Sequence, residues 1–422
     1  PPRHVPLKEK ESALDDLLAQ LRKVPAFNVI IKTAEILITG YIPTTADKDK
    51  SKFDFGPMNT TFSANHLEGF RMRVGGMTTA NLNPHWFGSG YLAYGVNDRK
   101  LKYNAKLTYS VNKKKYHEGE SPVNNISAIQ EYDVYTPGQD FLFTSKDNMF
   151  VAWKVGEPVT MMQYIRKTML QYQKEWLNGL TLTTWARNEN NEAAGTLRYD
   201  RYDADGTLTN LKSFTNTELG TQLRFAPGER AYNGREGKNS LFNLSKDAPV
   251  FKLSNQMGLK NVLGSDFNYN HTEISAEKRI WLSSFGHIDA LVTAGKVWDK
   301  VPFPLLIMPN TNQSITIQPQ AFNMMRALEF VSDQYVSFYF TYYMKGWILN
   351  RIPGVKWLRL REVISFSGFY GGLTDKNNPA LDPTGLYRFP EGTSPMGRTP
   401  YLEASVGLEN IFKILRSDYY RR

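Results

Sequence analysis

The chain has 422 residues and a net charge of +10; its mean hydropathy is a polar −0.45, although 13% of its residues are aromatic. That combination is unusual in soluble proteins and typical of transmembrane β-barrels, which show lipid one apolar strand face and gather aromatic rings at both interfaces. No stretch approaches the roughly 20 consecutive apolar residues of a spanning helix, so a helical membrane protein is excluded. Cysteine is absent, which excludes disulfides, thiolate metal sites and a cysteine nucleophile.

The first part of the chain differs from the rest. Leucines with helical spacing predict an amphipathic helix that ends near Pro25 (Leu14, Leu17, Leu18 and Leu21). We therefore divide the chain into an N-terminal amphipathic helical segment with a linker, residues 1–54, and an outer-membrane β-barrel, residues 55–422. Because the leucine stripe needs an apolar partner, we expect the helix on the periplasmic side, against or inside the barrel mouth.

Alternation of apolar and polar residues dominates the remainder, and it begins near Phe70. The clearest run places Tyr103, Ala105, Leu107, Tyr109 and Val111 on one face and Asn104, Lys106, Thr108 and Ser110 on the other. Such runs have the length of a tilted membrane-spanning strand. We predict an all-β fold, an antiparallel transmembrane β-barrel of about 12–16 strands. A charge at Leu107, on the predicted lipid face, should destabilise it far more than one at Thr108.

The gaps between runs are uneven. A short gap at 97–101 fits a periplasmic turn, and four long polar gaps fit extracellular loops (113–125, 189–216, 227–248 and 374–399). Two of these, 227–248 and 374–399, could fold inward and block the lumen. The segment 157–172 alternates poorly and fits either a helix or a bent strand.

Charged residues on the second strand face would point into the lumen. These are Arg71, Arg73, Lys106, Glu218, Arg224, Arg359, Arg361, Glu403 and Glu409. They fit either a salt-bridged interior that fixes strand register or a charged path for a solute or polypeptide. Because bulky and oppositely charged side chains share these faces, we expect a barrel that does not conduct like an open porin.

The sequence offers little catalytic chemistry. Its six histidines form no paired metal-binding motif, and neither a nucleophile elbow nor a phosphate-cradling glycine loop is present. His287 and Asp289 share a predicted inward face and are interpreted as lumen polar residues. We therefore predict no enzyme activity, no cofactor, and no catalytic, cofactor-binding or metal residues. Basic residues are scattered singly along the strands, so nucleic acid is not an expected partner.

Several segments resemble one protein family. The run NHLEGFRMRVGGMTT (65–79) resembles the opening barrel strand of a Bacteroidota outer-membrane family of unknown function, whose members usually carry an N-terminal carboxypeptidase-regulatory-like β-sandwich. Further similar segments are SDQYVS (332–337), GWILNRIP (346–353), LREV (360–363), GLENIFK (407–413) and DYYRR (418–422). The opening strand is also distantly similar to the BamA/TamA barrel superfamily, whose members insert or translocate proteins at the outer membrane.

The resemblance implies a protein in the outer membrane of a Gram-negative, Bacteroidota-type bacterium. It implies a component of outer-membrane protein assembly or secretion machinery, acting as a barrel subunit or translocation pore. A solute channel and an enzyme with its site at the barrel rim are the alternatives. Expected partners are outer-membrane lipid and lipopolysaccharide, with other outer-membrane or periplasmic proteins. The family has no assigned catalytic residues, and its pattern leads us to expect a further strand beyond Arg422.

Overall fold

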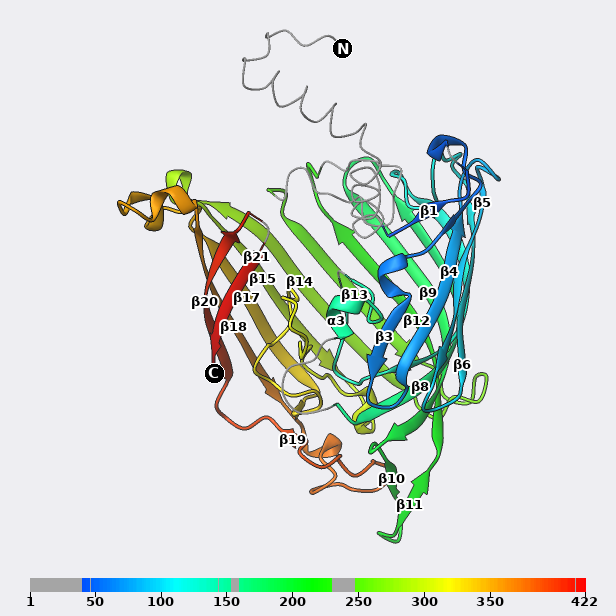
Figure 1. Cartoon of the computed structure of the whole chain (residues 1–422). Helices are drawn as coiled ribbons and strands as arrows, with labels where there is room; N and C mark the ends of the chain where they lie inside the picture. Colours follow the sequence, from blue (N-terminus) through cyan, green and yellow to red (C-terminus); the bar gives the residue numbers. More distant parts are fainter. Residues whose placement is uncertain (1–39, 46, 143, 153–158, 230–246, 414) are drawn as a thin grey trace.

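In a computed structural model of the chain, the described residues are 40–422 apart from 46, 143, 153–158, 230–246 and 414 (Figure 1). The predicted leucine-striped helix lies outside them. The described residues form one seventeen-stranded antiparallel sheet that curls into a barrel, which confirms the predicted fold class. The sheet begins at Ile42, ahead of the division that we placed between residues 54 and 55.

The sheet starts with three short strands, and the fourteen longer strands that follow pair in sequence, each with its neighbours along the chain. The short strands are β1 (Ile42–Pro43), β2 (Phe53–Phe55) and β3 (Phe62–Asn65). The longer strands are β4 (Gly69–Thr78), β5 (Trp86–Gly95), β6 (Leu101–Ser110), β7 (Asn124–Tyr135), β8 (Met161–Glu175), β9 (Leu180–Gly195), β12 (Ser213–Phe225), β13 (Val250–Gly258), β14 (Tyr269–Trp281), β15 (His287–Val297), β17 (Gln334–Tyr343), β18 (Arg361–Gly372), β20 (Tyr401–Ile411) and β21 (Leu415–Arg421). The poorly alternating segment 157–172 therefore falls mostly within a strand, β8.

The remaining elements are short. β10 (Tyr199–Tyr202) and β11 (Leu208–Leu211) form a hairpin, and β16 (Phe330–Val331) pairs with β19 (Ser394–Pro395). The helical turns are η1 (Lys48–Lys50), η2 (Met58–Thr60), α3 (Met149–Ala152), η3 (Ser283–Phe285), η4 (Phe303–Leu305), η5 (Leu349–Arg351), η6 (Lys356–Leu358) and η7 (Asp375–Asn377). Across the described residues, no helix has the length and apolar character needed to cross a membrane.

Exposure alternates along the strands as the sequence predicts. In β6, Leu107 is 52% exposed on the outer face, whereas Thr108 is fully buried and its hydroxyl lies 2.9 Å from Ser127 Oγ of β7. In β4, Phe70, Met72 and other apolar side chains are likewise exposed while Arg71 is buried. In a soluble protein the buried face of a sheet is apolar and the exposed face is polar. Here the exposed face is apolar and the buried face carries charges, which suits a lipid environment.

Successive connections leave alternate ends of an antiparallel barrel. We call the end that holds the β4–β5 connection (79–85) end A, and the end that holds the β3–β4 turn (66–68) end B. Of the four predicted extracellular loops, 113–125 and 227–248 leave end A, whereas 189–216 and 374–399 leave end B. Placing all four on one side was therefore wrong, because strand order fixes the end from which a loop leaves and polarity does not.

Among the described strands, the sheet ends at β3 on one side and at β21 on the other. Within the described part of the chain, β3 pairs with β4 alone and β21 pairs with β20 alone. No pairing joins β21 to β1, β2 or β3 among these residues. Figure 1 shows β3 and β21 on either side of the front of the barrel.

Leu107→Arg is expected to lower the free energy of unfolding by about 2–4 kcal/mol, because it places a charge mid-strand on the lipid face. The sequence suggested Thr108 as the tolerant comparison, but Thr108 is fully buried and a charge there would be costly too. Gln222, which lines a cavity inside the barrel, is the better control. Urea titration in lipid vesicles, followed by gel mobility of the folded form, measures both variants. Equal costs for Leu107→Arg and Gln222→Arg would contradict the assigned faces.

Candidate functional site

The tight β3–β4 turn aims a carboxylate into the barrel. The Asn65 side-chain oxygen accepts the backbone N–H groups of Leu67 and Glu68, at 3.1 and 2.8 Å. Gly69 follows with a φ of +64°, and a Cβ there would lie 2.5 Å from the Asn97 side chain. Glycine is therefore required at this position. The turn leaves Glu68 fully buried beside β4.

Arg71, on the inner face of β4, is the centre of a buried ionic cluster. Its guanidinium donates to both oxygens of Asp133 on β7, at 2.7 and 3.0 Å, and to Glu68 at 2.8 Å. It also contacts Asp147, at 3.2 Å. Asp147 belongs to the β7–β8 connection, 136–160. A fully buried arginine therefore binds two carboxylates of the wall and one of this connection.

Other charges complete the cluster. Arg73 donates to Asp147 at 2.7 Å, and Lys146 lies 3.0 Å from Asp133. Lys102 contacts Glu68 at 2.7 Å and Asp98 at 2.5 Å. The Arg71 cluster thus contains four cations and four carboxylates (Arg71, Arg73, Lys102 and Lys146; Glu68, Asp98, Asp133 and Asp147). Charges buried in a medium of low dielectric constant are stable only when opposite charges compensate them, and the equal numbers here meet that requirement.

The Arg71 cluster attaches the β7–β8 connection to the barrel wall. Burial opposes ionisation of Asp147, but the neighbouring Lys146, Arg71 and Arg73 outweigh it and hold the pKa of Asp147 below its ordinary value. Asp147 is therefore ionised at neutral pH and pairs with both wall arginines. We call residues 136–152 of this connection, apart from 143, the first inner loop; Figure 1 shows its helix, α3, within the barrel outline.

A second connection, between β15 and β17, also turns inward. We call residues 302–329 of it the second inner loop, and Figure 1 shows it in yellow inside the barrel. It meets the first inner loop through backbone and side-chain hydrogen bonds. Asp140 N donates to Asn310 Oδ1 at 2.8 Å, Asn310 Nδ2 donates back to Asp140 O at 3.0 Å, and Thr311 N donates to Gly138 O at 3.0 Å. The two loops are therefore in direct contact.

Glu403 fixes the second inner loop to β20. Its carboxylate is 1% exposed and accepts the backbone N–H groups of Asn323 and Met324, at 2.9 and 2.6 Å, and the hydroxyl of Tyr401 at 2.6 Å. Nearby loop residues pack on the inner faces of β18 and β20 in an apolar cluster (Phe322, Met325, Phe369, Met396 and Tyr401). Sequence reasoning placed Glu403 in the lumen but did not give its partner.

Glu403→Ala is expected to detach the second inner loop, because two buried backbone N–H groups lose their acceptor at a cost of about 1–3 kcal/mol each. Limited proteolysis of the folded barrel should then cut within 302–329 at least several-fold faster. Glu409→Ala is the matched control, since Glu409 lies on the same strand face, is partly exposed and pairs with Arg416 at 3.3 Å. Unchanged proteolysis in Glu403→Ala would contradict the anchoring role.

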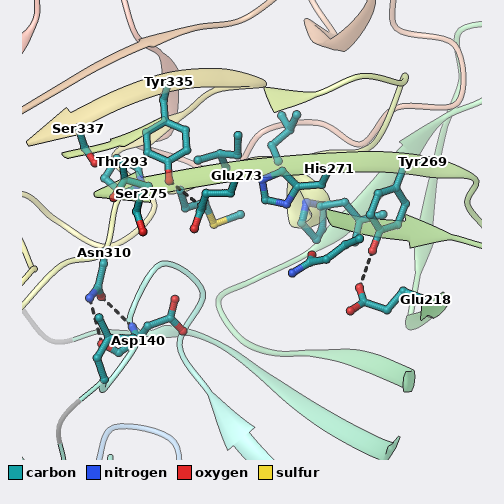
Figure 2. Close-up of a pocket in the computed structure, with 18 of the residues that line it drawn as sticks. Asp140, Glu218, Tyr269, His271, Glu273, Ser275, Thr293, Asn310, Tyr335 and Ser337 are labelled. Atoms are coloured by element: carbon teal, nitrogen blue, oxygen red, sulfur yellow. Dashed lines mark hydrogen bonds between the residues drawn. The ribbon is translucent and has the colours of Figure 1, made fainter. Parts of the chain in front are cut away.

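Between the inner loops and the far wall lies a cavity of about 580 Å³ (Figure 2). Glu218 lies at one side and accepts hydrogen bonds from Trp185 Nε1 at 2.9 Å, Arg187 at 2.8 Å and Tyr269 at 2.7 Å. Tyr335 donates to Glu273 at 2.7 Å on the opposite side. Within the described ranges, no group of three or more His, Cys, Asp or Glu residues is placed to hold a metal ion.

The structure brings most of the predicted lumen charges to the inner face and pairs them. Besides Arg71, Arg73, Glu218, Glu403 and Glu409, Lys106 pairs with Glu118 at 2.8 Å and Arg224 with Glu229 at 2.6 Å. Arg361 is exposed at the end-A start of β18. Arg359 was wrongly placed: it is exposed in the β17–β18 connection, with a φ of +52°, where strand alternation does not apply.

The two inner loops are not among the connections that we predicted to fold inward, and of the two predicted connections only 374–399 lies wholly within the described residues. Residues 230–246 lie outside the described part of the chain. The β18–β20 connection packs at end B instead, where Arg388 pairs with Asp200 of β10 at 2.7 Å and Tyr387 joins an apolar cluster with Tyr199. The partners in the Arg71 cluster and both inner loops were missed. An apolar window at 302–308 with two prolines and no alternation was the available signal for the second inner loop.

These features define a class: an antiparallel transmembrane β-barrel with a lumen occupied by two of its own loops. The chain belongs to the family of unknown function DUF5686, whose C-terminal domain matches residues 34–377. A comparison with curated proteins found no match.

Solved structures show where this fold occurs. BamA from Haemophilus ducreyi, in a crystal structure lacking POTRA domains 1–3, is similar with a TM-score of 0.51 and 10% identity. The match covers 93% of this chain and 74% of that one. CdiB from Acinetobacter baumannii matches with a TM-score of 0.38 and 12% identity, over 89% of this chain and 60% of that one. The similarity to BamA shows a shared fold. The similarity to CdiB is too weak to support any argument.

Proposed function

We propose that this chain is an outer-membrane barrel of the assembly or secretion type, acting as the barrel subunit of a larger complex. The observation that supports this most directly is the occupied lumen. The two inner loops are bonded to each other and anchored on β4 through Arg71 and on β20 through Glu403. An interior of this kind is unsuited to free diffusion of solutes. Binding of partner proteins at strand edges or on exposed loops, in contrast, needs no open lumen.

The edge of β3, which pairs with β4 alone among the described strands, would give such a subunit a means of contact. An unpaired strand edge offers a row of backbone donors and acceptors to which an extended segment of another protein can add. The fold shared with BamA is consistent with this role, although fold alone does not determine function. A translocation pore would use the same barrel after displacement of the inner loops.

The two alternatives have less support. A solute channel is favoured by the 580 Å³ cavity, which could hold a small polar solute, but the inner loops cover it. An enzyme with its site at the barrel rim would use His287 and Asp289. The Asp289 carboxylate, however, is bound by both Arg279 Nε and Nη2, at 2.6 and 2.7 Å. We therefore propose a protein without enzyme activity.

Location and partners follow from the same proposal. We place the protein in the outer membrane of a Gram-negative, Bacteroidota-type bacterium, in a family whose members carry a carboxypeptidase-regulatory-like domain. End A, where the chain enters the sheet through β1 and β2, would be periplasmic, and end B, with several long connections, extracellular. The β5–β6 turn at 97–101, for which the sequence suggested a periplasmic position, leaves end B and would then be extracellular. Lipid, lipopolysaccharide and other outer-membrane or periplasmic proteins would be its partners.

Depletion of the protein from its native cells tests the proposed function. We expect the amounts of several other outer-membrane barrel proteins to fall several-fold, as measured by quantitative proteomics of isolated outer membranes, while uptake of small solutes stays unchanged. Complementation with the intact gene should restore the membrane composition. An unchanged composition together with reduced solute uptake would overturn the assembly role and favour the channel.

A further inference from the structure

The β17–β18 connection, residues 344–360, leaves end A and carries η5 and η6. Figure 1 shows it in orange, projecting sideways from the barrel wall. We call it the end-A arm. It combines basic residues with exposed large apolar ones: Trp357 is 76% exposed, and Ile348, Ile352 and Leu358 are exposed as well. No Asp or Glu occurs between residues 344 and 361. An isolated loop in water gains nothing from displaying such residues together.

The end-A arm and the β20–β21 turn form a groove of about 920 Å³. Five cations line it: Lys345, Lys356, Arg359, Arg361 and Lys413. None of the lining residues is a carboxylate, and none of the five cations forms an ion pair with another described residue. The five positive charges in the groove amount to half of the chain's net charge of +10. The interior cations described above, in contrast, are paired.

The groove adjoins the apolar outer face of the barrel. Arg361 begins β18. Glu362 follows it and is buried, with its carboxylate accepting the backbone N–H groups of Ile348 and Leu349 in the arm, and the next outward residues of β18, Ile364 and Phe366, are exposed and apolar. Aromatic rings gather at the same end: Phe285 and Trp347 are in edge contact at 5.1 Å, and Lys345 Nζ lies 4.3 Å from the Trp281 ring. Tryptophan and basic residues just beyond an apolar band are typical of the layer where lipid headgroups meet hydrocarbon.

We propose that the end-A groove binds the phosphate-bearing headgroup of an anionic lipid in the leaflet at end A. The unpaired cations supply the charge complementary to the phosphate. Exposed Trp357 and Leu358 line the same groove, and they would contact the glycerol and upper acyl region of a lipid, which a free anion lacks. The proposed site uses neither the inner loops nor an unpaired strand edge, so it does not depend on the proposed role in assembly.

The test uses the purified full-length protein in a neutral detergent with three probes: dioctanoyl phosphatidylglycerol, dioctanoyl phosphatidylcholine and inorganic phosphate. Native mass spectrometry should show selective retention of phosphatidylglycerol. One cation near an anionic lipid contributes about fivefold to affinity, so Lys356→Glu/Lys413→Glu should lower phosphatidylglycerol retention about 25-fold or more. Trp357→Ala should lower the retention of phosphatidylglycerol and leave the binding of inorganic phosphate unchanged.

Lys260→Glu/Arg398→Glu is the matched control, because it changes the net charge by the same amount at exposed positions in end-B connections. It should retain lipid like the unmodified protein, and gel mobility of the folded form verifies that each variant folds. Equal retention of the two lipids, or equal losses in the two double variants, would overturn the proposal. Inorganic phosphate that displaces phosphatidylglycerol at comparable concentration would assign the groove to a free anion and overturn the lipid assignment.

Discussion

Replacing Arg71 by methionine is expected to lower the free energy of unfolding by at least about 3–5 kcal/mol, the usual cost of breaking a buried ion pair by removing one partner. The arginine is fully buried and contacts Glu68, Asp133 and Asp147. Its loss leaves three carboxylates with one cation fewer, so the first inner loop should detach as well. Urea titration in lipid vesicles measures the stability, and proteolysis reports the loop.

Arg224→Met is the control for this experiment. Arg224 also faces inward and is bound through two nitrogens to Glu229, at 2.6 and 2.7 Å, but its side chain is partly exposed. Water can therefore solvate Glu229 after the substitution, and the loss should stay near or below about 1 kcal/mol. A loss for Arg71→Met no greater than that for Arg224→Met would mean that the Arg71 cluster does not hold the barrel together.

Removal of the second inner loop should convert a closed barrel into a conducting one. The intact protein is expected to show no steady, large conductance in planar bilayers, because the two inner loops occupy much of the lumen. A barrel with fourteen long strands is wide enough for water once it is empty. Replacing residues 306–329 by a short Gly-Ser linker should therefore produce large, long-lived current steps.

The control for the loop deletion is a change of similar kind outside the lumen. Replacing residues 203–207, the tip of the β10–β11 hairpin, by two glycines leaves both inner loops in place, and that protein should remain closed. Steady large conductance from the intact full-length protein would contradict the occupied lumen and favour a solute channel. A silent, correctly folded 306–329 variant would show that the first inner loop alone suffices to close the barrel.

Strand positions and their faces could be predicted from the sequence because both follow from local rules. Side chains alternate with period two, and lipid tolerates only one of the two faces, so Leu107 and Lys106 are assigned without any knowledge of their neighbours. The same rule gives the inward orientation of Arg71 and Glu403. The alternation rule does not apply beyond the ends of a strand, and for this reason it gave the wrong position for Arg359 in the end-A arm.

The contacts inside the barrel could not be predicted in this way. Arg71 meets Asp133 across 62 positions and Asp147 across 76, and Asp140 meets Asn310 across 170. No periodic pattern encodes such separations, because they depend on which loops enter the lumen. Polar composition suggested 374–399, which packs at end B, whereas the second inner loop carries an apolar segment whose Phe303 and Leu306 are buried. In this lumen, buried apolar residues marked the inward loop better than length or polarity did.

The route between the anchors of the inner loops has a mechanical consequence. One anchor, Arg71, lies on β4, and the other, Glu403, lies on β20. The contacts Arg71–Asp147, Asp140–Asn310 and Glu403–Met324 therefore form a continuous connection between these two strands through the interior. Moving β4 away from β20 strains this connection, and breaking the connection lets the two strands move apart more easily. By thermodynamic reciprocity, whatever separates β4 from β20 also loosens the inner loops, and to the same extent in free energy.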